Sequence, residues 1–122
     1  MDIKSIKSIL SQGENEKIEF KQSFDREAIE TITAFSNSRG GVLLVGIKDD
    51  NVIVGVKIGQ ESVQNYINQV KNSTEPSLVI DMEQVAIEGK TILFIKADEF
   101  PISPSSPFPS KIHHKTPNIS TF

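Results

Sequence analysis

The sequence predicts an α+β domain, a two-layer sandwich in which helices pack on one face of a mostly antiparallel or mixed sheet. Three observations favour this class. Apolar residues recur at helical spacing in three separate segments. A short apolar run, residues 42–47, is typical of a central strand that is buried on both faces. Two pairs of predicted strands are joined by turn residues, as in β-hairpins. The predicted order is therefore α-β-α-β-β-α-β-β.

The first half of the chain supplies a helix, a strand and a second helix. Apolar residues at helical spacing between Ile3 and Leu10 predict a short amphipathic helix that ends at Gln12-Gly13. Residues 17–21 alternate between polar and apolar side chains, which indicates a half-buried strand. Asp25 is the expected N-cap of the next helix. Gly40 should supply the left-handed C-cap of this helix. A nucleotide-binding loop is not expected here, because such a loop leads into a helix, whereas Gly40 is followed by a predicted strand.

The second half should contain two hairpins with a helix between them. The turn at residues 49–51 predicts that residues 52–56 return antiparallel to the central strand. Residues 63–70 have the spacing of an amphipathic helix. Residues 78–87 and 91–97 form the last predicted hairpin. We expect a single core between sheet and helices, made of Ile18, Phe20, Ile29, Ile32, Phe35, Leu44, Tyr66, Ile67, Ile92 and Phe94.

A change of composition near Pro101 divides the chain into two parts. Five of the six prolines, five serines and no acidic residue lie from there to the end. Prolines at such short intervals interrupt both helices and strands. We therefore predict a folded domain over residues 1–100 and an extended or disordered Pro/Ser-rich tail over residues 101–122.

Composition excludes several classes of function. The chain contains no cysteine, which rules out disulfides, thiolate metal sites and a cysteine nucleophile. No apolar run approaches the ~20 residues that span a bilayer, so we expect a cytoplasmic protein with no membrane partner. The net charge is −3, and residues 1–100 carry 11 basic against 16 acidic groups, a net of −5. Since this sign opposes binding to phosphates, a nucleic-acid site would have to be a local basic strip.

Three acidic residues could converge on a hard cation. Glu14, Glu19 and Asp49 lie before, on and after the predicted strands, and carboxylate oxygens are the ligands that Mg²⁺ or Mn²⁺ prefers. Glu14 must then lie off the strand, because residues five apart on one strand face opposite sides. Lys21 would either compensate the negative charge of the three carboxylates or neutralise Glu19 in a structural ion pair. The alternative interpretation is that these are solvated surface groups.

Four basic residues are candidates for phosphate contacts. Lys17 and Lys21 share a face of the first predicted strand, while Arg39 and Lys48 flank the central strand. Such a strip could bind the backbone of DNA or RNA. The alternative is that these residues form ordinary surface ion pairs, which contribute little.

The chain resembles a known family at three segments. Residues 14–21, residues 34–49 and Val54-Gly55 are similar, in order and spacing, to the Schlafen-type AlbA-like domain, formerly labelled a divergent AAA module. The resemblance covers about residues 5–100. It implies a nucleic-acid-related domain that stands at the N-terminus of prokaryotic transcriptional regulators. In animal Schlafen proteins the domain carries a metal-dependent ribonuclease with three carboxylates, which by motif position correspond to Glu14, Glu19 and Asp49, with Lys21 nearby.

Three hypotheses about function follow from the residues and the resemblance together. The first is a DNA- or RNA-binding module that forms the N-terminal domain of a transcriptional regulator. The second is a Mg²⁺- or Mn²⁺-dependent endoribonuclease that acts on structured RNA. The third is a protein-interaction or dimerisation module, in which the chain forms a homodimer and which the acidic charge of residues 1–100 favours.

Overall fold

The computed structural model describes residues 3–48, 50–59, 61–99 and 111–112. Three helices and six strands are found in these ranges. In chain order they are α1 (Ile3–Gln12), β1 (Ile18–Lys21), α2 (Arg26–Ser36), β2 (Gly41–Val45), α3 (Ser62–Ser73), β3 (Thr74–Glu75), β4 (Asp81–Ile87), β5 (Lys90–Ala97) and β6 (Lys111–Ile112). None of the helices in the described part of the chain is long and apolar enough to cross a membrane.

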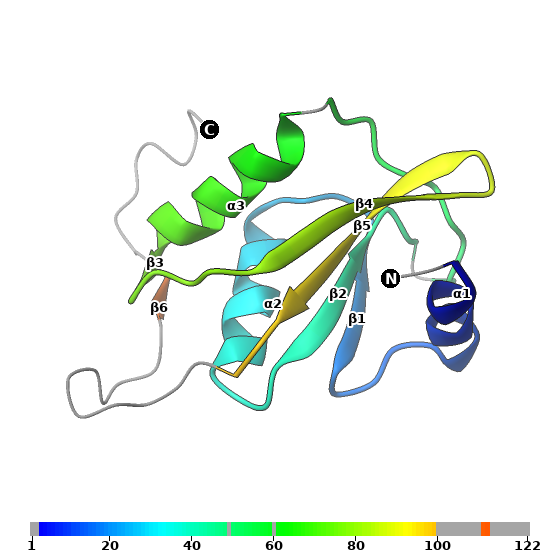
Figure 1. Cartoon of the computed structure of the whole chain (residues 1–122). Coiled ribbons are helices and arrows are strands. Elements are labelled where there is room, and N and C mark those ends of the chain that lie inside the picture. Colours follow the sequence, from blue (N-terminus) through cyan, green and yellow to red (C-terminus); the bar gives the residue numbers. More distant parts are fainter. Residues whose placement is uncertain (1–2, 49, 60, 100–110, 113–122) are drawn as a thin grey trace.

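The main sheet is mixed and has the strand order β1-β2-β5-β4 (Figure 1). β1 runs parallel to β2, whereas β5 is antiparallel to both of its neighbours, β2 and β4. Leu44 marks the middle of the sheet, because it lies opposite Phe20 on β1 and opposite Phe94 on β5. The α+β class and the mixed sheet that the sequence predicts are therefore confirmed.

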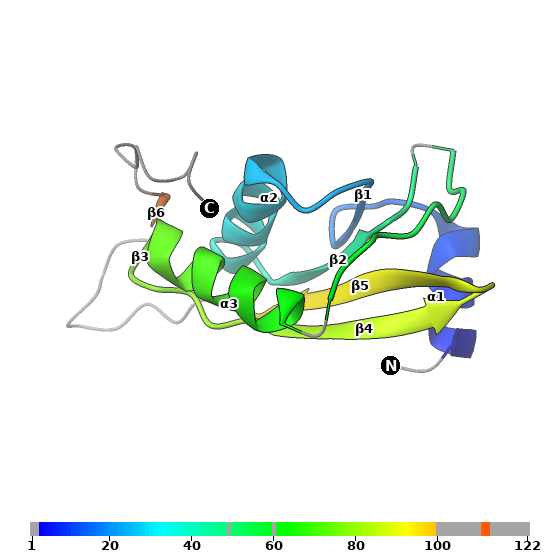
Figure 2. The same cartoon turned by 90° about the horizontal axis from the view of Figure 1, so that it is seen from above.

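Apolar side chains cover both faces of this sheet. The larger cluster joins α2 and α3 to residues such as Leu43 and Leu93, and the smaller one joins Ile6 of α1 to Phe20 and Leu44 on the opposite face. Seen from above, α2 and α3 lie toward one end of the strands and α1 toward the other (Figure 2). The expectation of one core was wrong. Consecutive residues of a buried strand point to opposite faces, so each face needs its own cover.

The expected strand over residues 52–56 is reduced to an isolated antiparallel bridge between Ile47 and Ile53. The chain does turn back as predicted, but the N–H groups of Val54 and Gly55 both donate to the carbonyl of Gly46, at 2.8 and 2.9 Å. The antiparallel neighbour of β2 in the sheet is β5. The described residues between β2 and α3 therefore form a loop and not a strand, although the N–H of Val56 still donates to the carbonyl of Thr91 on β5 at 2.8 Å.

The predicted N-cap of α2 is confirmed, because the Asp25 carboxylate accepts a hydrogen bond from the N–H of Ala28 at 3.3 Å. At the other end the C-cap residue is Asn37 and not Gly40. Gly40 does have the predicted left-handed backbone, with a φ of +81°, and its N–H donates to the carbonyl of Phe35 at 2.8 Å. The last hairpin is confirmed as well, since Glu88 and Gly89 both have positive φ between β4 and β5, which is typical of a type I′ turn.

The predicted tail contains one short strand. β6 pairs antiparallel with β3, so that Ile112 lies opposite Thr74 and Lys111 opposite Glu75. The other residues of the predicted tail, 101–110 and 113–122, lie outside the described residues. The boundary at residue 100 stays a prediction.

Gly40 allows a direct test of how α2 is connected to β2. A Cβ atom on Gly40 would lie 2.7 Å from the carbonyl oxygen of Ala97, whereas a Cβ on Gly89, with φ +75°, would meet no atom within 4 Å. Gly89→Ala should therefore cost only the left-handed backbone term, about 1 kcal/mol of unfolding free energy, and Gly40→Ala should cost clearly more. Urea denaturation measures both. Equal losses would show that the close approach of Gly40 to β5 does not limit the fold.

Candidate functional site

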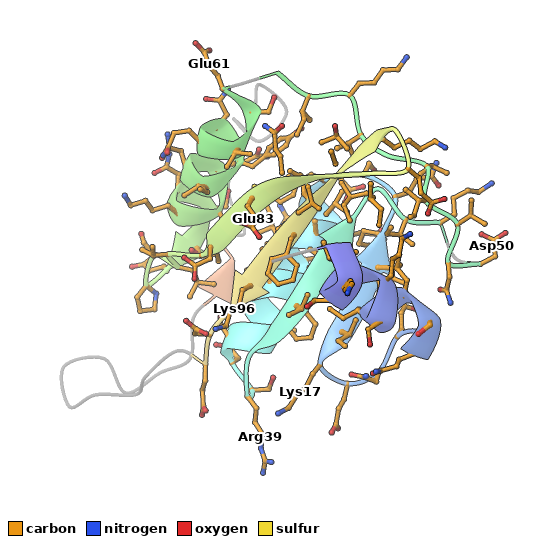
Figure 3. All side chains as sticks on the ribbon, turned by 45° about the vertical axis from the view of Figure 1, so that its right-hand side comes forward. Lys17, Arg39, Asp50, Glu61, Glu83 and Lys96 are labelled. Carbon is orange, nitrogen blue, oxygen red and sulfur yellow. The ribbon has the colours of Figure 1, made fainter. Side chains whose placement is uncertain are left out.

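Lys17 and Arg39 lie at the end of the sheet where β1 and β2 begin. Lys17 directly precedes β1, and Arg39 lies two residues before β2. Because these strands are parallel, their first residues meet at the same edge of the sheet. The N–H of Val42 donates to the carbonyl of Lys17 at 2.8 Å, which fixes the two segments against each other. Both side chains are exposed and project away from the molecule (Figure 3).

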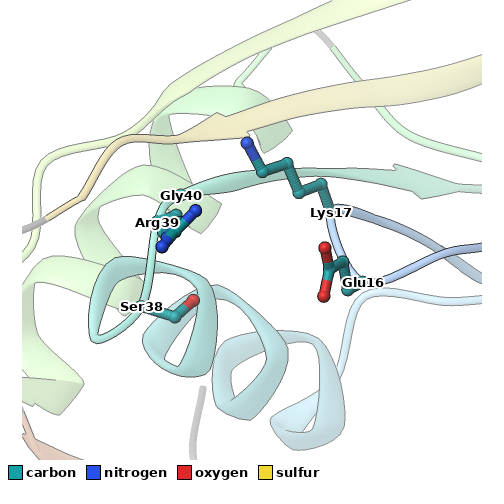
Figure 4. A pocket seen from close by; sticks show the side chains of 5 residues that line it. All are labelled: Glu16, Lys17, Ser38, Arg39 and Gly40. Atoms are coloured by element: carbon teal, nitrogen blue, oxygen red, sulfur yellow. The ribbon is translucent and has the colours of Figure 1, made fainter.

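The two cationic side chains face one hollow of about 460 Å³. Glu16 and Lys17 line it from the segment before β1, and Ser38, Arg39 and Gly40 from the connection between α2 and β2 (Figure 4). No ion pair of Lys17 or Arg39 is formed with any residue that the structure describes. Two cations therefore face a single carboxylate. Such a site suits an anion with several oxygens, because a guanidinium group can donate to two phosphate oxygens at once.

The other two predicted basic residues do not join this site. Lys21 ends β1, four residues or ~13 Å of extended strand from Lys17. Its ammonium group lies 3.5 Å from a carboxylate oxygen of Glu19 and 3.8 Å from one of Glu27. Lys48 follows β2 and therefore lies toward the far end of the sheet. The structure thus brings together two of the four candidates.

Glu14 is placed off the strand, as a converging site would require, but it already has a structural partner. The chain reverses at the bridge between Asn15 and Ile18, so that Glu14 lies beside β1. Its carboxylate accepts a hydrogen bond from the N–H of Phe20 at 2.8 Å. β1 is an edge strand. The carbonyls of Lys17 and Lys21 accept hydrogen bonds from Val42 and Gly46, so the backbone of odd-numbered residues points toward β2 and that of Phe20 points toward the free edge. The Glu14 carboxylate thus protects the free edge of the sheet.

Glu19 faces α2. Its carboxylate accepts a hydrogen bond from the hydroxyl of Thr31 at 2.9 Å and also forms the ion pair with Lys21. Sequence reasoning missed Thr31 as a partner of Glu19. The signal that could have found it is the i, i+4 spacing of Glu27 and Thr31, which places both polar side chains on one face of α2.

A second hollow of about 570 Å³ lies between β1 and this face of α2. Among the described residues, four carboxylates line it, from Glu16, Glu19, Glu27 and Glu30, together with one cation, Lys21. The excess of negative charge disfavours a phosphate there. An anion is therefore directed to the Lys17 and Arg39 side of Glu16.

Asp49, the third predicted carboxylate, lies outside the described residues. Asn51, two residues later in the sequence, is described: a Cβ atom on Gly13 would lie 3.9 Å from its side-chain nitrogen. The segment before Glu14 thus runs beside Asn51. In the ranges that the structure describes, no three Asp, Glu or His side chains form a group that could hold a metal ion. The described residues alone therefore do not complete a Mg²⁺ or Mn²⁺ site.

Comparison with known proteins gives one family and several relatives. The sequence model of the family described as Schlafen, AlbA_2 matches residues 14–120. A protein of Ureaplasma parvum serovar 3 that is named as an uncharacterised ATP-binding protein is 35% identical over an alignment of 107 residues, and the match covers 71% of this chain and 29% of that protein. The chain therefore spans less than a third of the length of this curated relative.

Two solved structures share the fold. One is the N-terminal domain of a protein from Nitrosomonas europaea that is named for its relation to the ATP-dependent DNA helicase RecG. It has a TM-score of 0.66 and 22% identity, and the match covers 92% of this chain and 79% of that one. The other is the DIP2311 protein of Corynebacterium diphtheriae, with a TM-score of 0.64, 15% identity, and coverage of 90% and 23% respectively.

The edge contact of Glu14 yields a test that separates a structural from a catalytic role. Glu14→Ala leaves the N–H of Phe20 without its acceptor and should lower the unfolding free energy by about 1 kcal/mol. Glu14→Gln keeps an acceptor oxygen and should lose less than half of that. Thermal or urea unfolding of the pair decides. A loss that is the same for both variants would contradict the structural role.

Proposed function

We propose that this chain, which belongs to the Schlafen, AlbA_2 family, is a nucleic-acid-binding module and forms the N-terminal domain of a transcriptional regulator. Residues 1–100 would form this module, and the phosphates would bind at the hollow between Lys17 and Arg39. The observation that carries the proposal is the pair of exposed cations that face one hollow without an ion-pair partner among the described residues.

The chemistry of this pair fits a phosphodiester backbone. An exposed cation without a carboxylate partner gives up little when it binds a phosphate, because no ion pair has to be broken. Arg39 can donate two parallel hydrogen bonds and Lys17 adds a second charge, while Ser38 offers a hydroxyl on the same rim. Such contacts position a backbone and do not read sequence, so the proposal covers DNA and RNA alike.

The acidic surplus of the chain restricts where a nucleic acid can lie. The groove between β1 and α2 carries four carboxylates, so a backbone that follows the molecular surface should run past Lys17 and Arg39 and avoid α2. A module that uses so few phosphate contacts binds weakly on its own. This agrees with a chain that spans only part of its curated relative and of the DIP2311 protein. The RecG-related neighbour, named for a DNA helicase, gives further support.

The double variant Lys17→Gln/Arg39→Gln tests the proposal. Each phosphate contact contributes about −0.9 to the slope of log K against log salt on duplex DNA, so the variant should reduce that slope by about 2. Lys71→Gln/Lys90→Gln is the matched control, since it removes the same charge from two other exposed lysines. Fluorescence anisotropy with duplex DNA and structured RNA at several salt concentrations is the measurement.

Two outcomes would contradict this proposal. If the two double variants reduced the salt slope of binding equally, the net charge, and not the Lys17–Arg39 site, would govern binding. If neither nucleic acid bound in a salt-dependent way, a protein-interaction or dimerisation module would replace the proposal, and sedimentation would then show a homodimer.

A second candidate function is a Mg²⁺- or Mn²⁺-dependent endoribonuclease that uses Glu14, Glu19 and Asp49, with Lys21 compensating their charge. The observation that favours it is the proximity of Gly13, which precedes Glu14, to Asn51, which follows Asp49 by two residues in the sequence. A hard cation at this place would supply an activated water for phosphodiester cleavage.

The nuclease candidate is tested with Asp49→Ala and, as a matched control, Asp50→Ala at the next position of the sequence. Asp49→Ala should abolish Mn²⁺-dependent cleavage of structured RNA and weaken Mn²⁺ binding measured by calorimetry, because it removes a ligand. Asp50→Ala should retain both properties. Cleavage that is unchanged in Asp49→Ala removes the nuclease candidate and leaves the binding module.

A further inference from the structure

A third hollow, of about 520 Å³, lies at the opposite end of the parallel strands from Lys17 and Arg39. Phe24, from the segment after β1, and Tyr66, from α3, are among its lining residues. Val54 and Val56, from the loop after β2, also line it. The volume falls within the ~300–1,000 Å³ that is usual for ligand pockets. Ligands of folds with parallel strands commonly bind at the carboxyl ends of those strands, which is where this hollow lies.

The two aromatic rings form a stacked pair. Their centroids lie 4.3 Å apart and their planes differ by 24°. Both side chains are only partly buried, and they pack against the larger apolar cluster together with Val56 and Ile58. The rings therefore have a fixed orientation but are not fully covered. A partly exposed stack of this kind can extend by one more flat ring, since aromatic systems gain energy from parallel, offset contacts.

The rim of the hollow adds polar groups of the right kind. Gln22, Ser23 and Lys57 line the hollow and are exposed. No carboxylate is among the described residues that line the hollow, and Lys57 forms no ion pair with any described residue. Aromatic and apolar walls thus meet an amide, a hydroxyl and one cation. This combination matches a planar heteroaromatic ring that carries an anionic group.

We infer that this hollow binds a nucleotide unit. Its base would stack on the Phe24–Tyr66 pair, and Lys57 would hold its phosphate. Two sources supply this chemistry: a free nucleotide, and an unstacked base of a nucleic-acid strand. If the ligand is a base of a strand, the inference rests on the proposed function, because the protein must first hold the strand. If the ligand is a free nucleotide, the inference is independent of Lys17 and Arg39.

The composition of the chain makes the test specific. Tyr66 is the one tyrosine of the sequence and there is no tryptophan, so the tyrosine ring signals in an NMR spectrum report on this site alone. Adenosine monophosphate and single-stranded oligodeoxyadenylate serve as the two ligands, and ribose 5-phosphate is the control without a base. We expect upfield shifts of the Tyr66 ring protons with a base-containing ligand and none with ribose 5-phosphate.

Three variants test the individual contacts. Tyr66→Leu should weaken binding about tenfold, the usual effect of removing one stacking ring, and Tyr66→Phe, which keeps the ring, should bind like wild type. Lys57→Gln should lower the affinity for adenosine monophosphate to that for adenosine. Because the ring shifts are measured on the wild-type chain, an unfolded Tyr66→Leu variant does not decide the outcome.

The ligands and variants separate the two sources and the two proposals. A response to adenosine monophosphate alone supports the free nucleotide, and a response to the oligonucleotide supports a base of a strand. Lys17→Gln/Arg39→Gln should leave the shifts by adenosine monophosphate intact even if it abolishes binding of the strand, so failure of the proposed function is recognised separately. Unchanged Tyr66 signals with both ligands, or equal shifts with ribose 5-phosphate, would overturn the inference.

Discussion

The close packing at residues 40–41 is the constraint on which the rest of the structure depends. Gly40 has a φ of +81° and lies so near β5 that a Cβ atom would be 2.7 Å from the carbonyl oxygen of Ala97. A Cβ atom on Gly41 would overlap the ring of Phe35. Two successive positions without side chains let β2 enter the sheet between β1 and β5 directly at the end of α2. The same reversal leaves Arg39 outside the sheet, beside Lys17.

This geometry divides the molecule into regions of different chemistry. The beginnings of β1 and β2 carry exposed cations, and the groove toward α2 carries carboxylates. The ends of the same strands lead to the aromatic pair of Phe24 and Tyr66. Lys21 lies between these regions and is held by Glu19 and Glu27, so it stabilises the groove and offers little free charge to a ligand. The net acidity of the chain is therefore compatible with a local site for an anion.

Features set by neighbouring residues could be predicted from the sequence, and features set by distant pairing could not. The Asp25 cap, the left-handed Gly40 and the turn at Glu88-Gly89 follow from local backbone preferences. The sequence did not reveal that α1 covers its own face of the sheet, because alternation within β2 does not say which helix lies on which side. The contact of Glu19 with Thr31 and the stack of Phe24 on Tyr66 each join separate elements. Helical spacing places Thr31 on a polar face of α2, but it does not say that this face lies against Glu19, and no spacing rule predicts the aromatic stack.

The central claim is that Lys17 and Arg39 form the contact surface for nucleic acid. Amide chemical shifts of the ¹⁵N-labelled chain, followed during titration with duplex DNA and structured RNA at two salt concentrations, test it most directly. The account predicts that shifts concentrate at residues 16–17 and 38–42 and weaken at the higher salt. Shifts that are absent there, or that cluster on the acidic face of α2 at Glu27 and Glu30, would contradict it.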